Sequence, residues 1–185
     1  VRVGWRLALG GAPIERDEYL ARIDASPGNR ILETAVGTGT NLLALPPGPD
    51  TFGLDISHAM LRRCRHRLNR DGRRAALVLA DMASAPFADS VFDVVFHMGG
   101  LQFASDPLRC IAEMHRMARP GGQVLIVEET ASAEVLARRS GVAGLEGLVP
   151  EESADVRIDT ISGGELVAIE FLVKFRGAES RMPPP

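Results

Sequence analysis

The sequence predicts an α/β fold with a doubly wound, mostly parallel sheet of seven strands. Short runs of aliphatic and β-branched residues alternate with helical patterns from about residue 30 onward. These runs are continuous rather than alternating, as expected for strands buried on both faces of a parallel sheet. Two later runs alternate in polarity around a short turn, which predicts a hairpin that adds one antiparallel strand.

The first five strands are expected where the continuous apolar runs lie, at residues 30–35, 51–55, 75–80, 92–96 and 123–127. Two helices between them have start signals. Ser57 is a candidate N-cap, and Asp106 followed by Pro107 is a second cap with proline at the first helical position. We expect the second helix to stop at Pro120-Gly121-Gly122. The repetition of strand, helix and strand predicts right-handed crossover connections.

The pattern predicts three parts, which are an N-terminal helical segment at residues 1–28, a sheet domain at 29–176 and a flexible, proline-rich tail at 177–185. The first part has a weak amphipathic helix from Glu15 to Ile23 and could cover a substrate. Its Trp5 and Tyr19 fit either a substrate lid or ordinary packing. In the second part, residues 155–161 and 166–173 form the hairpin.

The amino-acid composition excludes several classes of function. Of the 185 residues, 45% are hydrophobic and 24% charged, which suits a folded domain with a sizeable core. The net charge of −3 does not indicate nucleic-acid binding, which is typical of basic proteins. No apolar run approaches the length of about 20 residues that spans a bilayer, and no secretory signal is visible. Two cysteines, Cys64 and Cys110, do not make a disulfide framework, so a reduced, cytoplasmic setting is expected.

A glycine-rich corner is the most informative stretch. Glu33-Thr34-Ala35-Val36-Gly37-Thr38-Gly39 leads from a strand into a short helix that Pro46-Pro47 ends. Glycines at such a corner let the backbone turn sharply and let a ligand lie against bare main chain. A tight turn without any ligand is the alternative, because a single glycine-rich turn is a weak signal.

Three acidic residues end successive strands. Asp55 lies about 20 residues past the glycine corner, where a carboxylate can bind ribose hydroxyls. A simple helix-entry aspartate is the alternative for this residue. With Glu33 before the corner and Asp81 after the third strand, the acids mark the carboxyl edge of the sheet, where open α/β sheets bind ligands.

In this order the motifs resemble those of class I S-adenosylmethionine-dependent methyltransferases, which have a Rossmann-like fold. The segments that carry the likeness are Glu33–Gly39, Gly53–Ser57, Ala80–Met82, Pro86–Val95 and Arg119–Gly122. The resemblance runs from about Asn29 to Glu128. It is strongest to the small-molecule group (methyltransferase domain 11) of ubiquinone/menaquinone and phospholipid N-methyltransferase-like enzymes. The Gly-Thr-Gly-Thr-Asn-Leu run and Phe96–Leu101 carry this narrower likeness.

The resemblance implies S-adenosylmethionine as cofactor and S-adenosylhomocysteine as product. Gly37 and Gly39 would approach its methionine part, and Glu33 would help order the loop and the amino group. Asp55 would bind the ribose hydroxyls, with Ile56 packing on the adenine. Further contacts implied at the cofactor are those of Ala35, Thr38, Asn41, Met60, Asp81, Met82, Ala83, His97 and Met98. Asp81 would accept from the adenine N6, and the main chain of Met82 would reach the ring.

The chain departs from the family pattern at Ala35, which stands where the family's first loop glycine would be. Compared with glycine, alanine adds a methyl group at the place where the backbone approaches the ligand in this family. The pattern also disfavours a nicotinamide oxidoreductase, because Leu42 stands where a third glycine would pack and the second strand ends in an acid that would repel a 2′-phosphate.

Methyl transfer is an in-line displacement, in which the protein aligns the acceptor and excludes water. No metal is expected, because the four histidines lie far apart without ligand spacing. His97, placed by the sequence at the rim, is a candidate general base or substrate-orienting donor. A contact with the cofactor carboxylate or the loop is its alternative role. The basic helix around His66 is expected to be a solvated face rather than a phosphate or RNA site.

Two functions from different classes follow from this reasoning. The first is methyl transfer to a small, partly apolar acceptor. The second is a protein that binds the cofactor without methylating, as a partner subunit or a catalyst of a rearrangement. The segments that cover the acceptor in the family are short here. Either the pocket is open, a homodimer or a partner subunit closes it, or loops are missing from this sequence.

Overall fold

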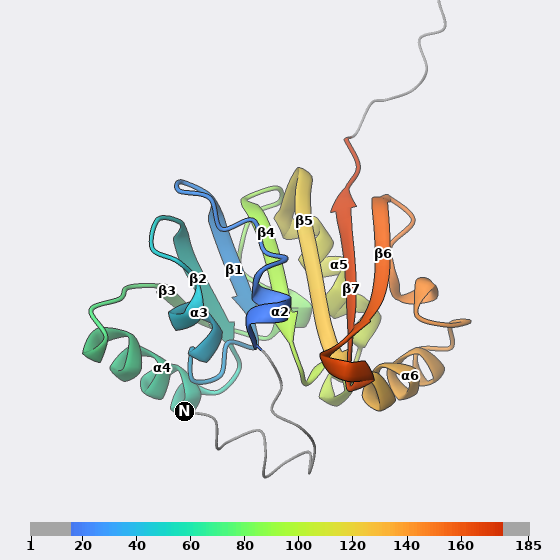
Figure 1. Ribbon diagram of the computed structural model, residues 1–185, viewed down its shortest axis with the longest axis horizontal. Helices are drawn as coiled ribbons and strands as arrows, with labels where there is room; N and C mark the ends of the chain where they lie inside the picture. Colours follow the sequence, from blue (N-terminus) through green and yellow to red (C-terminus); the bar gives the residue numbers. More distant parts are fainter. Residues whose placement is uncertain (1–15, 176–185) are drawn as a thin grey trace, which may run out of the picture.

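The computed structural model describes residues 16–175 and contains a seven-stranded sheet in the order β3-β2-β1-β4-β5-β7-β6 (Figure 1). The strands are β1 (Arg30–Thr34), β2 (Asp50–Asp55), β3 (Ala76–Leu79), β4 (Phe92–Met98), β5 (Ala118–Glu129), β6 (Ser153–Ile161) and β7 (Leu166–Val173). Strands β1 to β5 pair in parallel, and β7 pairs antiparallel with both β5 and β6. The predicted fold class is confirmed, with β7 as the strand that runs against the others.

Helices cover both faces of the sheet (Figure 1). They are α2 (Arg16–Leu20), α3 (Thr40–Ala44), α4 (His58–Arg70), α5 (Pro107–Met117) and α6 (Thr130–Arg139), with short 3₁₀ turns η1 (Met82–Ser84), η2 (Leu101–Phe103), η3 (Glu146–Leu148) and η4 (Ser162–Gly164). One apolar core packs the sheet against α5 and α6, and a second packs its other face against α2, α3 and α4. This is the layered arrangement that a parallel sheet requires to bury both faces.

The strand order reverses between β1 and β4, because the chain runs outward from β1 to β3 and then returns to the other side of β1. Connections leave β1 and β4 in opposite directions at this point, which opens a crevice at the carboxyl ends of the strands. In Figure 1 these ends lie at the lower edge of the sheet. The glycine corner after β1 and the loop after β4 therefore meet at the place where such folds bind ligands.

The expected caps are present. The Ser57 side chain accepts from the backbone N–H of Met60, and Asp106 accepts from that of Arg109. Helix α3 ends at Ala44, since Leu45 precedes a proline and takes an extended conformation.

Two predicted boundaries are wrong. Helix α5 ends at Met117 and not at Pro120-Gly121-Gly122, because Ala118 is already extended and pairs with Phe92 at the start of β5. Arg119, which precedes the proline, also disfavours helical backbone. The N-terminal helix ends at Leu20, earlier than the expected end at Ile23. Glu15, Trp5 and the tail at 177–185 lie outside the described residues, so the proposed lid and tail stay predictions.

Candidate functional site

The glycine corner between β1 and α3 is held in a left-handed conformation. Ala35, Gly37 and Gly39 have φ angles of 52°, 54° and 74°. The Asp55 carboxylate on β2 accepts from the backbone N–H of Gly37 at 2.7 Å, and Val36 donates to the carbonyl of Leu54 at 2.9 Å. Strand β2 thus fixes the corner through one carboxylate and one main-chain hydrogen bond.

The two glycines of the corner serve different purposes. A Cβ at Gly37 would meet nothing closer than the Ala35 carbonyl at 3.9 Å, so its backbone borders open space. A Cβ at Gly39 would come within 2.5 Å of the Cys64 Sγ on α4. Gly39 is required for helix packing, whereas Gly37 presents bare main chain that a ligand can approach.

Strand register places Glu33 and Asp55 on the same face of the sheet. Glu33 pairs with Gly53 across β1 and β2, and side chains two residues apart on a strand point the same way. Both side chains are buried, with exposed fractions of 2% and 7%. Asp55 is close enough to raise the pKa of Glu33, which shows that the first two predicted acids come together.

The Glu33 carboxyl accepts a side-chain hydrogen bond at one of its two oxygens. Its Oε1 accepts from the Asn41 side-chain amide at 2.6 Å, and the Asn41 Oδ1 accepts from the Tyr19 hydroxyl at 2.8 Å. Its Oε2 is buried and has no hydrogen-bond partner in the structure. Burial raises the pKa of Glu33 to about 8, against the lowering effects of Asn41 and Arg16.

Helix α2 contributes a positively charged side chain, Arg16, near Glu33. Arg16 lowers the pKa of both Glu33 and Tyr19, although burial still raises that of Tyr19 to about 12. The Arg16 Nε is itself buried without a partner. The sequence analysis missed Arg16, since nothing in its local pattern distinguishes it from a surface arginine.

Asp55 is positioned at the end of β2 by backbone amides. Its second oxygen accepts from the Ser57 N–H at 2.8 Å, so each oxygen already receives one hydrogen bond and keeps a further acceptor site. Ile56, beside it, is 73% exposed, and Met60 is half-buried one turn into α4. An exposed isoleucine next to a buried aspartate suits a ligand with two parts. A flat apolar ring can pack on the isoleucine, and hydroxyl groups can donate to the aspartate.

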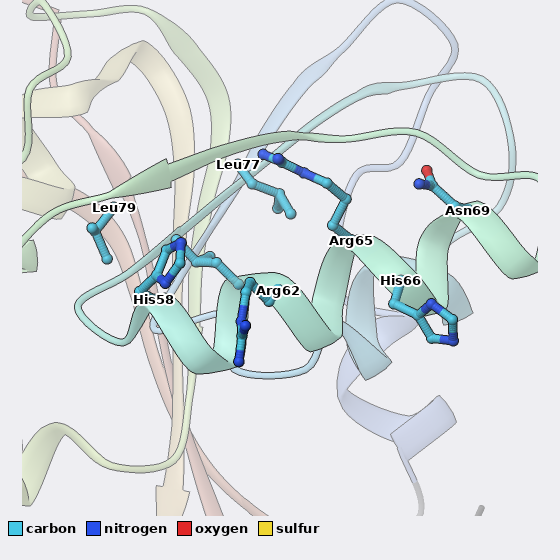
Figure 2. A pocket seen from close by; sticks show the side chains of 8 residues that line it. His58, Arg62, Arg65, His66, Asn69, Leu77 and Leu79 are labelled. Atoms are coloured by element: carbon cyan, nitrogen blue, oxygen red, sulfur yellow. The ribbon is translucent and has the colours of Figure 1, made fainter.

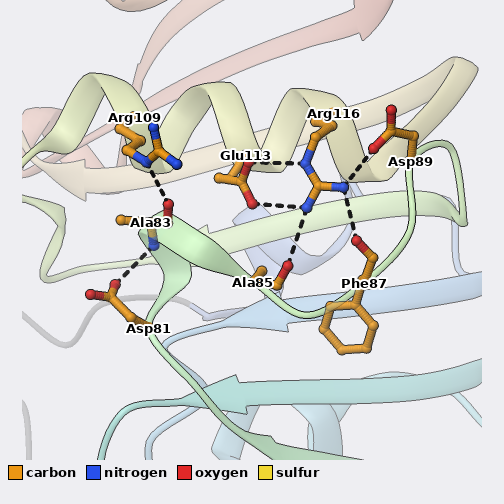
Figure 3. A network of polar contacts seen from close by, with 8 residues as sticks. All are labelled: Asp81, Ala83, Ala85, Phe87, Asp89, Arg109, Glu113 and Arg116. Carbon is orange, nitrogen blue, oxygen red and sulfur yellow. Dashed lines mark hydrogen bonds and ion pairs between the residues drawn. The ribbon is translucent and has the colours of Figure 1, made fainter.

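Asp81 lies at the third strand end and is exposed, where it caps η1 by accepting from the Ala83 N–H at 2.8 Å. The residues after it are fixed to α5 (Figure 3). Arg109 donates to the Ala83 carbonyl, and Arg116 donates to the carbonyls of Ala85 and Phe87 and pairs with Asp89 and Glu113. Met82 and Ala83 are half-buried in this turn.

His97 lies near the carboxyl end of β4, but its ring is buried, with 1% exposed. Nδ1 lies 3.1 Å from the Thr34 hydroxyl, and Nε2 lies 3.4 Å from the Glu128 carboxylate. Glu128 accepts from the backbone N–H groups of Gly100 and Leu101, which follow β4. His97 thus lies at the expected edge of the sheet with its ring enclosed by protein, and its role stays a prediction.

His97 also faces away from Glu33. Thr34 pairs with His97 across β1 and β4, whereas Glu33 pairs with Phe96, so His97 and Glu33 lie on opposite faces of the sheet. The alternation of side chains along the strands could be read from the sequence. The contact of His97 with the buried Glu128 could not, because Glu128 lies 31 positions further along the chain. Met98, on the same face as Glu33, is buried in the core under α2, α3 and α4.

A separate hollow of about 450 Å³ lies between α4 and β3 (Figure 2). Its lining carries Arg62, Arg65, His58 and His66 and no carboxylate. Arg62, Arg65 and His66 are exposed, as expected for a solvated basic face, and none of the predicted cofactor residues lines this hollow.

The described residues contain no cluster of His, Cys, Asp and Glu side chains that could hold a metal ion. In the same part of the chain, no helix combines the length and the apolarity needed to cross a bilayer.

The fold and this arrangement of acids around a glycine corner define a class I S-adenosylmethionine-dependent methyltransferase domain. Residues 32–126, about half of the chain, match the family model described as methyltransferase domain (Methyltransf_11). The chain belongs to this family.

A curated relative supports the same assignment. The ubiquinone/menaquinone biosynthesis C-methyltransferase UbiE of Burkholderia mallei is 37% identical over 113 residues, which are 59% of this chain and 46% of the relative. The chain thus spans about half the length of the curated relatives it matches.

Solved structures share the fold. A methyltransferase in complex with the Haloferax volcanii Trm112 activator has a TM-score of 0.70 at 17% identity, covering 86% of this chain and 88% of that one. A SAM-dependent methyltransferase from Aquifex aeolicus has a TM-score of 0.68 at 15% identity, covering 93% and 94%. The [4+2]-cyclase SpnF has a TM-score of 0.59 at 26% identity, covering 61% and 43%.

Replacing Gly39 by alanine should destabilise the fold by about 3 kcal/mol, since the left-handed φ costs about 1 kcal/mol and the overlap with Cys64 adds 1–3 kcal/mol. Urea unfolding of Gly39→Ala and of the control Gly72→Ala measures this. Gly72 also has a positive φ, but its Cβ would meet nothing within 4 Å. Equal losses in the two variants would contradict the packing role of Gly39.

Ala35→Gly should stabilise the protein by about 0.5–1 kcal/mol, because glycine adopts the left-handed φ of 52° without the steric cost that alanine bears. The matched control is Ala112→Gly in the exposed middle of α5, which should lose about 1 kcal/mol. Denaturant midpoints that move in the same direction for both variants would show that Ala35 is unstrained.

Proposed function

We propose that this protein transfers the methyl group of S-adenosylmethionine to a small-molecule acceptor. The observation that carries the proposal is the buried Glu33 carboxyl, whose unpartnered oxygen lies on the same sheet face as Asp55 and beside the glycine corner. An acid in this state accommodates a cationic ligand group, and the bare backbone at Gly37 leaves room for it.

These residues fit S-adenosylmethionine, which supplies an electrophilic methyl group on a sulfonium. Glu33 would take the ammonium, and the backbone from Ala35 to Gly39 would follow the methionine chain. Asp55 would accept from the ribose hydroxyls with the acceptor sites that its two amide hydrogen bonds leave. Ile56 and the turn after Asp81 would bind the adenine. Thr38, Asn41, Met60, Met82, Ala83 and Met98 complete the proposed set.

For the reaction itself, the chain has to align the acceptor with the sulfonium methyl and exclude water. His97 enters this proposal as a positioning residue, because its buried ring contacts Thr34 and Glu128, and Glu128 holds the loop of Gly100 and Leu101. A direct role as general base requires the ring to reach the acceptor. His97→Gln tests the two roles, since loss of turnover at unchanged cofactor affinity favours the base.

The acceptor is proposed to be small and partly apolar. The curated relative is a C-methyltransferase of ubiquinone/menaquinone biosynthesis, and Phe103, which follows β4 in η2, is 84% exposed. An exposed phenylalanine near the carboxyl edge offers apolar surface to an acceptor, a second copy of the chain or a partner subunit. The free, buried Cys64 and Cys110 fit the reduced cytoplasmic setting proposed for the enzyme.

A cofactor-binding protein that does not methylate is the second candidate. Its support is that SpnF, named as a [4+2]-cyclase, shares this fold, and that another neighbour of the same fold is described with an activator protein. Incubation with S-adenosylmethionine and candidate quinol, phenol and amine acceptors separates the two functions. Release of S-adenosylhomocysteine supports methyl transfer, whereas binding without release supports the second candidate. Binding of NAD in place of S-adenosylhomocysteine would overturn both.

Asp55→Asn should weaken binding of S-adenosylhomocysteine about 10- to 100-fold, because a hydrogen bond to a charged group contributes roughly 1.5–3 kcal/mol. Isothermal titration calorimetry measures the affinity. Asp71→Asn is the control, since it removes the same charge from an exposed ion pair at the end of α4. Unchanged affinity in Asp55→Asn would remove this residue from the ribose site.

A further inference from the structure

Helix α4 and the turn that follows it are strongly basic. Of the 21 basic and 24 acidic residues of the chain, seven arginines and one aspartate lie at residues 58–74. This segment therefore has a formal net charge of +6, against −9 for the remainder of the chain and −3 in total. Such a concentration of charge on one helix creates a local positive potential, although the protein as a whole is acidic.

Most of these arginines have no partner in the protein. Three of the seven donate hydrogen bonds to other groups of the chain, and they are Arg67, Arg70 and Arg73. The other four are exposed and make no hydrogen bond or ion pair with any described residue, and they are Arg62, Arg63, Arg65 and Arg74. Unpaired guanidinium groups are available to an external anion, and their planar fork matches the oxygens of a phosphate group.

The hollow between α4 and β3 places apolar surface beside this charge. Figure 2 shows Arg65 extending from α4 toward Leu77 on β3. The lining of the hollow also includes Leu61 and Leu79, and Leu79 is 55% exposed. A lining of arginines and leucines suits a partner that presents phosphate groups next to hydrocarbon.

The charges of the protein are separated along the sheet. Strands β3 and β6 are its two edges, and α4 lies at the β3 end (Figure 1). Residues 141–173, which include β6 and β7, contain seven acidic residues and one basic residue, Arg157. A negatively charged surface therefore attracts the β3 end and repels the β6 end, which defines one orientation of the protein on that surface.

We propose that α4 and the edge strand β3 form a docking surface for an anionic phospholipid bilayer. The unpaired arginines of α4 bind the phosphates of the headgroups, and Leu79 contacts the apolar part of the interface. Clusters of about four to eight basic residues on a helix are typical of proteins that bind anionic lipids. Because α4 begins close behind the end of β2, docking brings the carboxyl edge of the sheet near the lipid.

Two other occupants fit the surface less well. Proteins that bind single-stranded nucleic acid stack bases on aromatic side chains, and residues 58–79 contain no aromatic residue. A second copy of the chain would have to present its acidic β6 end, and contacts that join opposite ends of a molecule do not close into a dimer. Asp159 and Glu170 at that end already pair with Arg22.

Sedimentation of the full chain with lipid vesicles tests the proposal. The protein should bind vesicles of phosphatidylcholine that contain about one third phosphatidylglycerol, and should not bind vesicles of phosphatidylcholine alone. Raising the salt concentration to about 1 M should release the bound protein, because the screening length then falls to about 3 Å.

Paired substitutions locate the surface. Arg62→Gln together with Arg65→Gln should weaken binding to the anionic vesicles about 25-fold, because each basic residue near such a surface contributes about 1 kcal/mol, or about fivefold. The matched control is Arg138→Gln together with Arg157→Gln, which removes the same charge from exposed arginines of α6 and β6. The control should bind as the wild type does. All four side chains lack partners among the described residues, so thermal unfolding should be unchanged in both variants.

Equal weakening in the two paired variants would overturn the proposal, because binding would then follow net charge and not the α4 surface. Failure to bind the anionic vesicles, or equal binding to neutral ones, would also overturn it. Binding of an RNA oligonucleotide that is lost in the α4 variant, without vesicle binding, would assign the surface to nucleic acid instead. Self-association without vesicles that is lost in the same variant would assign it to a second copy.

The proposal and the proposed function fail separately. Arg62 and Arg65 are not among the residues proposed to bind the cofactor, so the α4 variant should bind S-adenosylhomocysteine with the affinity of the wild type. A chain that binds anionic vesicles through α4 but binds no S-adenosylhomocysteine would overturn the proposed function alone. The reverse result would overturn only the docking surface.

Discussion

The site depends on the desolvation of one carboxyl group. Glu33 is buried at the end of β1, one of its oxygens receives an amide from Asn41, and the other has no partner. Burial disfavours the charged form, which raises the pKa of Glu33 to about 8. In the proposed function, a group in this state gains from a cationic ligand, and the backbone at Gly37 borders open space.

Side-chain alternation along the strands places the acids of the proposed ligand site and His97 on opposite faces of the sheet. Glu33 and Asp55 point to the face covered by α2, α3 and α4, while Thr34 and His97 point to the face covered by α5 and α6. On the second face, Glu128 holds the backbone that follows β4. The loops at the carboxyl edge are thus shaped from both sides of the sheet, with Glu33 and Asp55 on one side and Glu128 on the other.

Arginines on the helices fix those loops further. Arg67 on α4 donates to Thr38 in the glycine corner, Arg109 and Arg116 on α5 hold residues 83 to 89, and Arg139 on α6 donates to the carbonyl of Gln102 in η2. Hydrogen bonds from a guanidinium are stronger than neutral ones. Because a loop at the end of a parallel strand lacks ladder partners, these contacts replace the sheet as its support.

The sequence by itself determined the seven-stranded fold, the glycine corner and the positions of Glu33 and Asp55, because strand periodicity and turn chemistry are local properties that neighbouring residues encode. It also carried the alternation that sets His97 and Glu33 on opposite faces. Only the tertiary structure placed Arg16 beside Glu33 and buried the ring of His97 against Glu128. These contacts join segments far apart in the chain, and burial depends on everything packed around a side chain, so no local pattern encodes them.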